Sequence, residues 1–133
     1  ALAARGGVAG MYFMPFLRAS GQPMAEDLVR HIEHAVSVCG EDHVGLGSDG
    51  PISPVPFDDK FREAHREDVR RRRELGISAP GEVDDVYTFI PDLNTPRRFE
   101  AIAVLLAARG HSDARIGKIL GGNFARVMGE VWG

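Results

Sequence analysis

Two short apolar segments decide the fold: GVAGMYFMPF at residues 7–16 and HVGLGSD at residues 43–49. Each is bounded by glycine, proline or acidic residues, as is typical of strands buried on both faces of a parallel sheet. A helix is predicted between them, from Pro23 to Gly40, because apolar residues recur there at helical intervals: Leu28, Ile32, Ala35, Val36 and Cys39. Strand, helix and strand form a βαβ unit, so we predict an α/β fold with a parallel sheet.

Two parallel strands alone make an incomplete sheet. They would leave their edges unpaired and their apolar faces in water, so we expect further strands from elsewhere or cover from C-terminal helices. Residues 1–5 have the composition of a last helical turn, which Gly6 and Gly7 would end. The chain is therefore expected to begin within a larger fold.

The remainder of the chain is predicted to be mainly helical. Residues 51–57 hold three prolines and should form an irregular loop. Residues 58–75 are highly charged and should form a helix, followed over residues 76–95 by a long excursion with at most a short element near residues 86–89. Three short helices should close the chain, capped at their N-termini by Thr95, Ser112 and Asn123.

These elements predict a single domain over residues 1–133. Residues 1–57 would hold the strand-helix-strand unit and its loop, and residues 58–133 a mainly helical extension. Cys39 is the only cysteine, so no internal disulfide can form, and we expect it to be a small buried residue. Trp132 is expected to pack at the C-terminus.

Charge and hydropathy give no reason to expect nucleic acid or a membrane as partner. The net charge is −3 and the isoelectric point is near 5.9. His65 and the arginines at residues 70–73 lie among acidic residues, which favours a solvated helical face over a nucleic-acid-binding patch. No apolar run approaches the ~20 residues that cross a bilayer, so no transmembrane segment is predicted, and the location in the cell stays open.

Asp49 is the strongest candidate for chemistry. It stands where the second predicted strand meets the proline-rich loop, and in parallel α/β folds this end of the sheet carries ligands and catalytic groups. Position alone also allows a plain turn over Asp49, Gly50 and Pro51.

The residues that follow the first strand are candidates for a substrate side-chain pocket. Met14, Pro15, Phe16 and Leu17 should face the same rim of the sheet as Asp49. An interpretation as ordinary core residues is equally open.

Structural roles are favoured over metal binding for the other histidines. Residues 111–113 spell His-Ser-Asp, a metal-ligand pattern, but they follow a glycine between two predicted helices, where Ser112 suits an N-cap. His31 and His34 lie on a helix expected on the outside of the fold, away from the strand ends. His43 opens the second strand at its other end and is expected to be structural.

Several segments together resemble a known family. They are the glycines and strand of residues 6–16, the helix end at residues 31–40, the segment DHVGLGSDG at residues 42–50, and a tail at residues 91–93, 105–113 and 118–127. In this order and spacing they resemble the C-terminal portion of the zinc-dependent membrane (renal) dipeptidases.

The resemblance implies a (β/α)8 metallohydrolase-type barrel, of which this chain would hold the last two strand units and a C-terminal helical subdomain. It implies two bridged zinc ions and a dipeptide substrate with a free amino end. Asp49 matches the family's carboxylate at the end of the final strand, which manages protons beside the metals.

The family's metal ligands come from earlier strands: a His-x-Asp pair, a bridging glutamate and two further histidines. None of these strands is present, so we predict no metal ligand here and an isolated chain that is inactive without the N-terminal part of the barrel or another subunit. Where many relatives have Phe-Asp between the strand aspartate and its glycine, Gly50 here follows Asp49 directly. The alternative is a non-catalytic fragment or assembly module that complements another chain, and homo-oligomerisation is left open.

Overall fold

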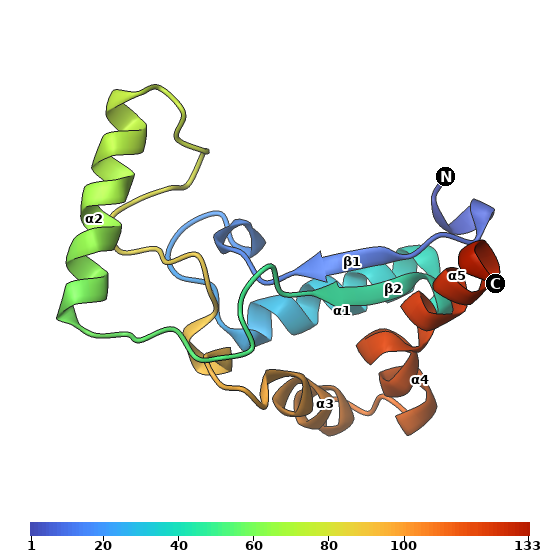
Figure 1. Ribbon diagram of the computed structural model, residues 1–133. Helices are drawn as coiled ribbons and strands as arrows, with labels where there is room; N and C mark the ends of the chain where they lie inside the picture. Colours follow the sequence, from blue (N-terminus) through green and yellow to red (C-terminus); the bar gives the residue numbers. More distant parts are fainter.

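The computed structural model describes residues 1–133 and has a two-stranded parallel sheet with helices packed against it, while its first strand stays partly exposed (Figure 1). Strand β1 runs over Ala9–Tyr12 and β2 over Val44–Gly47, with Ala9 beside Val44 and Tyr12 beside Gly47. The predicted parallel pair is confirmed, but burial on both faces is wrong for β1, whose residues alternate between half-buried and exposed. Both strands are shorter than the apolar runs that predict them, because the first run turns into the 3-10 helix Pro15–Leu17.

Helix α1, Ala25–Cys39, connects the two strands and runs beside them (Figure 1). It begins two residues after Pro23, and Gly40, with φ of 85°, ends it as predicted. Asp92 accepts hydrogen bonds from the Ala25 amide at 2.9 and 3.1 Å, so the free N-terminus of the helix is satisfied by a distant carboxylate.

One apolar core lies between α1, the strands and the C-terminal helices. Side chains from α1 and β2 are fully buried in it together with side chains from helix α3, Arg98–Ala108. The largest of these buried side chains are Leu28, Ile32, Val29, Val44, Ile102, Leu106 and Ile119. Cys39 is half-buried and packs against the same cluster, so the core is built by the apolar stripe that the sequence shows.

The first C-terminal helix starts later than predicted. Thr95 does not cap it: α3 begins at Arg98, and the Thr95 hydroxyl accepts a hydrogen bond from the Arg97 amide at 3.3 Å within the preceding turn. Pro96 therefore lies in that turn and not in the helix. The Ser112 cap of α4, Asp113–Gly117, is confirmed by the hydrogen bond from the Arg115 amide to its hydroxyl, at 3.3 Å.

Asn123 was predicted as an N-cap, and this is wrong. The π-helical segment Lys118–Gly122 joins α4 to α5, Asn123–Trp132, so Asn123 already has helical φ and ψ angles. Its side chain is only 3% exposed and donates to the carbonyls of Glu41 and Val44, both at 2.7 Å. The residue anchors the amino end of β2.

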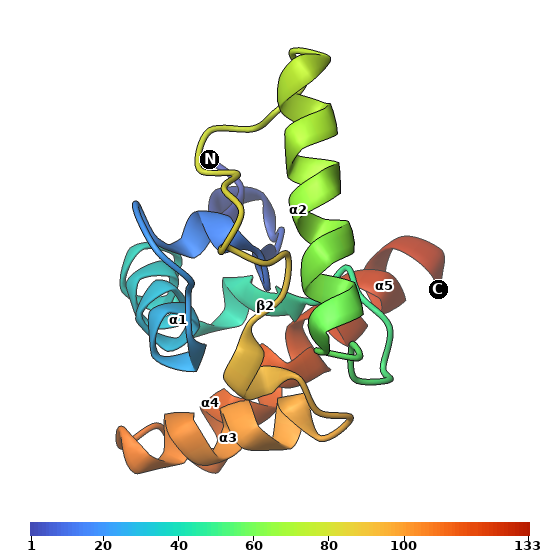
Figure 2. The ribbon, with the colours of Figure 1, turned by 90° about the vertical axis from the view of Figure 1, so that its left-hand side faces the viewer.

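The predicted charged helix is confirmed as α2, Asp59–Glu74, which stands apart from the other helices in Figure 1 and is nearest the viewer in Figure 2. Asp58 caps it by accepting a hydrogen bond from the Phe61 amide at 2.8 Å. Residues 75–90 form no helix or strand, so the short element considered near residues 86–89 is absent, and a 3-10 turn follows at Pro91–Leu93. Figure 1 shows α2 beyond the carboxyl ends of both strands.

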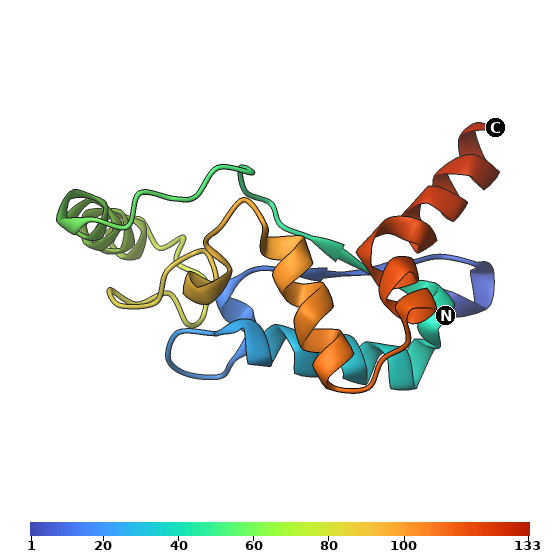
Figure 3. The same ribbon diagram turned by 90° about the horizontal axis from the view of Figure 1, so that it is seen from below.

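Trp132 does not pack at the C-terminus, as the sequence led us to expect. It is 78% exposed and lies at the end of α5, which extends away from the sheet (Figure 3). None of the helices combines the length and the apolar character that crossing a membrane requires.

Candidate functional site

The candidate site lies at the carboxyl ends of the two strands. Tyr12 and Gly47 are the last paired residues, and the Phe13 amide still donates to the Gly47 carbonyl at 3.2 Å. Asp49 follows two residues later with φ of 48°, a left-handed conformation that aspartate tolerates better than most residues. The sharp turn places Asp49 at the rim of the sheet.

Tyr12 holds the Asp49 side chain across this rim. Its hydroxyl donates a hydrogen bond to Asp49 Oδ2, although Asp49 itself is exposed. The hydrogen bond raises the pKa of Tyr12, and burial and the negative charge of Asp49 add to this effect. The phenol therefore stays protonated and remains a donor. Sequence reasoning missed Tyr12, since nothing local marks a partner 37 positions away.

A pocket of about 140 Å³ opens beside Asp49. Apolar side chains of Phe13, Ile90 and Leu93 line it, and Ser48 and Asn94 add polar groups. A carboxylate at the edge of a small pocket with both apolar and polar lining residues is the arrangement expected for a catalytic or substrate-orienting group.

Two side chains fix the loop that follows Asp49. Asn94 accepts from the Val55 amide at 2.7 Å and donates to the Val55 carbonyl at 2.9 Å. Arg98 is buried and donates to the Ile52 carbonyl at 3.2 Å. Neither residue was singled out from the sequence, because their partners are backbone groups far away in the chain.

The predicted substrate-lining residues do not share the pocket of Asp49. Met14 and Phe16 line a second pocket of about 190 Å³. Leu17 packs against the core, and its carbonyl lies 2.8 Å from His31 Nε2. A role in substrate binding stays a prediction for Met14, Phe16 and Leu17.

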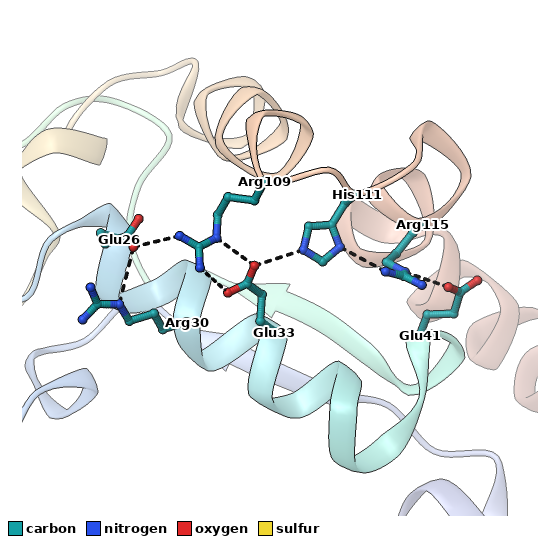
Figure 4. Close-up of polar contacts among 7 residues, drawn as sticks. All are labelled: Glu26, Arg30, Glu33, Glu41, Arg109, His111 and Arg115. Carbon is teal, nitrogen blue, oxygen red and sulfur yellow. Dashed lines mark hydrogen bonds and ion pairs between the residues drawn. The ribbon is translucent and has the colours of Figure 1, made fainter.

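The His-Ser-Asp segment forms part of an ion-pair network between α1 and the C-terminal helices (Figure 4). His111 Nε2 lies 3.3 Å from Glu33, and Arg115 donates to His111 Nδ1 at 3.4 Å. The members of the network drawn in Figure 4 are Glu26, Arg30, Glu33, Glu41, Arg109, His111 and Arg115. The interpretation of residues 111–113 as a helix start is confirmed.

The network lowers the pKa of two of its carboxylates, Glu33 and Glu41. The hydrogen bond from Arg109 is the main cause that lowers the pKa of Glu33. Hydrogen bonds from Lys118 and then Arg115 lower the pKa of Glu41 to about 2. Both acids therefore stay ionised and hold the C-terminal helices to the N-terminal half.

The predictions for two further histidines differ: the one for His43 is confirmed and the one for His65 is wrong. His43 is structural as predicted, since its Nδ1 lies 2.9 Å from the Gly7 carbonyl at the start of β1. His65 is not solvated as predicted: it lies parallel to Phe61, with ring centroids 6.3 Å apart, and 4.9 Å from the ring of Tyr87. Aromatic side chains of the excursion fold over it and take the place of solvent.

The arginines of α2 are largely exposed and pair with acids, as a solvated face requires. Arg72 contacts Glu82 at 2.8 Å and Arg71 pairs with Asp68. No cluster of three or more histidine, cysteine, aspartate or glutamate side chains that could hold a metal ion occurs in the chain.

The strands, α1 and the Asp49 rim are the part of the chain with a recognisable family pattern. Residues 1–59 match the membrane dipeptidase family, peptidase family M19. The resemblance to membrane dipeptidases is thereby confirmed for the segment that contains both strands and Asp49.

A curated relative extends the likeness along the chain. The "Uncharacterized protein in pqqA 5'region" of Klebsiella pneumoniae is 33% identical over 132 residues, which is 96% of this chain and 36% of that protein. The matched residues thus include the C-terminal helices, which lie outside the membrane dipeptidase match.

Two solved structures share the fold. One, described as the dipeptidase AC, a metallopeptidase of family M19, has a TM-score of 0.64 at 21% identity over 98% of this chain and 30% of its own. An amidohydrolase from Pseudomonas aeruginosa has a TM-score of 0.68 at 24% identity over 98% of this chain and 38% of its own. The chain spans only 30% to 38% of the length of all three proteins.

Proposed function

We propose that the protein to which these residues contribute is a dipeptidase-like, metal-dependent hydrolase. The observation that carries the proposal is the position of Asp49, held by Tyr12 at the carboxyl end of a parallel strand pair. The match of residues 1–59 to the membrane dipeptidases supports it from sequence. The (β/α)8 barrel is part of the proposal, with β1 and β2 as its last two strands.

Asp49 is proposed to receive or relay a proton during peptide hydrolysis. The Tyr12 hydroxyl donates a hydrogen bond to Asp49 Oδ2. This contact orients the carboxylate and leaves Asp49 Oδ1 available to a water or substrate group. A positioned carboxylate can accept the proton of an attacking water when geometry and charge suit. The adjacent pocket would hold the substrate close to this oxygen.

The residues of this chain do not make a metal site by themselves. Asp49 is a single carboxylate, and no group of three or more candidate ligands surrounds it. Metal sites of hydrolases use several histidine and carboxylate ligands. We therefore propose that the ligands of a zinc pair lie outside these residues, and that this chain supplies Asp49 and part of the substrate pocket.

The test is Asp49→Asn in the intact enzyme. Asparagine keeps the shape of the side chain but cannot accept the proton, so dipeptide turnover should fall by about 10²- to 10⁴-fold while bound zinc stays unchanged. Asp85→Asn is the control, because Asp85 is exposed and lies outside the Asp49 pocket.

Turnover near the wild-type value in Asp49→Asn would remove Asp49 from the mechanism. A zinc-loaded wild-type protein that hydrolyses no dipeptide would instead contradict the hydrolase assignment, and would favour the assembly-module alternative.

A further inference from the structure

A second pocket lies next to the pocket beside Asp49. This second pocket, of about 190 Å³, lies between the residues that follow β1 and the helix α2. Phe61 and Thr88 line both pockets. A ligand held at Asp49 could therefore extend one group past Phe61 into the second pocket.

The walls of the second pocket are mostly apolar. Val69 and Val86 are 3% and 6% exposed, and Pro15 is buried beneath them in the same lining. Met14 and the exposed Phe16 complete the lining on the side of β1. The volume is below the about 300–1,000 Å³ of sites for drug-sized ligands, so it suits a single side chain.

His65 gives this apolar pocket one polar group without a partner. Its ring is fixed against Phe61 and Tyr87, and its Nε2 atom is buried and makes no hydrogen bond within the chain. Leaving a buried polar group unpaired costs stability, so such a group in a pocket indicates a partner that arrives with a ligand.

The acidic residues of the same lining do not favour a cationic ligand. Asp68 pairs with Arg71. Glu82 accepts from Arg72 at 2.8 Å and from the Ala79 amide at 2.9 Å. With both carboxylates engaged by neighbours, His65 and the Thr88 hydroxyl are the polar groups that remain, and His65 Nε2 is the one that is buried without a partner.

We propose that the second pocket is a substrate side-chain subsite that accepts an aromatic side chain ending in a hydroxyl, namely tyrosine. The ring contacts the apolar walls, and the phenol pairs with His65 Nε2. A hydroxyl both donates and accepts, so it satisfies either tautomer of the imidazole. The subsite rests on the proposed dipeptidase function and specifies its substrate class.

The experiment compares matched dipeptides on the intact, zinc-loaded enzyme. Values of kcat/KM are measured for Ala-Tyr against Ala-Phe and for Tyr-Ala against Phe-Ala, so that either substrate position can reveal the subsite. We expect tyrosine to be favoured over phenylalanine at one position by about 10-fold or more, because a site built around a hydrogen bond discriminates against an analogue that lacks it.

His65→Phe keeps the aromatic packing and removes the polar atom. It should abolish the preference for tyrosine, so that the kcat/KM values for the matched tyrosine and phenylalanine dipeptides agree within about twofold. Glu67→Gln, at an exposed position of α2, is the matched control and should keep the preference.

Equal kcat/KM values for the tyrosine and phenylalanine dipeptides in the wild type would overturn the subsite, whether or not the variant folds. So would a preference that survives in His65→Phe. Failure of the zinc-loaded wild type to hydrolyse any of the four dipeptides would overturn the dipeptidase proposal itself.

Discussion

Tyr12 and Asp49 join the ends of two strands through one hydrogen bond. The carboxylate sits on a residue with positive φ, a conformation that persists only when its surroundings hold it. Asn94 and Arg98 hold the loop on one side, and Tyr12 holds the side chain on the other. Tyr12 thus sets the direction of the carboxylate, while Asn94 and Arg98 hold the loop that follows it.

Removing the Tyr12 hydroxyl should release the Asp49 side chain without removing its charge. For Tyr12→Phe in the intact enzyme we expect kcat to fall by about 10-fold with little change in KM. The reason is that the variant loses the contact that orients Asp49, a group used in the transition state. Steady-state kinetics provide the measurement. Tyr87→Phe is the control, because the Tyr87 hydroxyl makes no hydrogen bond in the chain, and an equal loss of kcat in it would contradict a specific role for Tyr12.

Helix α5 packs against β1 and β2 through the ring of Phe124. A Cβ atom on Gly45 would lie 2.4 Å from Phe124 Cε2, and one on Gly10 would lie 3.3 Å from Phe124 Cζ. Glycine at both positions therefore lets the ring approach the backbone of both strands.

Gly45→Ala should overpack this contact and lower the free energy of unfolding by about 1–3 kcal/mol. Chemical denaturation measures the loss, and Phe124→Leu in the same chain should recover part of it. Gly47→Ala is the matched control in the same strand, since no atom lies within 4 Å of its added Cβ. Equal destabilisation by both alanines would show that loss of glycine, and not the contact with Phe124, is responsible.

Elements whose signals are local could be predicted from the sequence. The two apolar runs gave the parallel pair, helical spacing gave α1, and Ser112 lies where its cap was expected. The position of Asp49 at the strand end followed from the same pattern. Its partner Tyr12 did not, because a pattern of neighbours carries no information about a contact across 37 positions.

Two of the errors, at Asn123 and His65, share one physical cause. Asparagine often caps helices, but Asn123 is buried against β2, where its side-chain amide donates to the Val44 carbonyl instead of serving a helix start. His65 lies among charges in sequence, yet the fold brings Tyr87 from the excursion against its ring. In both cases distant residues overrode the local preference.

At the scale of the whole molecule, the network of Figure 4 ties α1 and the turn Glu41–His43 to α3 and α4. Glu41 accepts from Arg115 and Lys118, both at 2.7 Å. Its pKa of about 2 in the folded state lies below the ordinary value of 4.5. As pH falls, the unfolded chain therefore binds the proton first.

This order gives the sign of the pH dependence. The contribution of Glu41 is fully present above pH ~4.5 and is lost as pH falls through about 2. Tm measured from pH 7 to 2 should decline over this window, and Glu41→Gln should have a lower Tm at pH 7 and a shallower decline. Glu63→Gln, on the exposed face of α2, should follow the wild type. A slope unchanged by Glu41→Gln would assign the acid sensitivity to other carboxylates.

Helix α5 is synthesised after both strands and holds their amino ends. Asn123 donates a hydrogen bond to the Val44 carbonyl, 79 positions earlier in the chain, and Arg126 donates one to the Gly6 carbonyl, 120 positions earlier. Contacts so distant in sequence close late, after much chain entropy has been lost. A nascent chain that has left the ribosome as far as α4 carries two apolar strands with unsatisfied carbonyls at their base, and this is the stage of synthesis at which it most needs protection from aggregation.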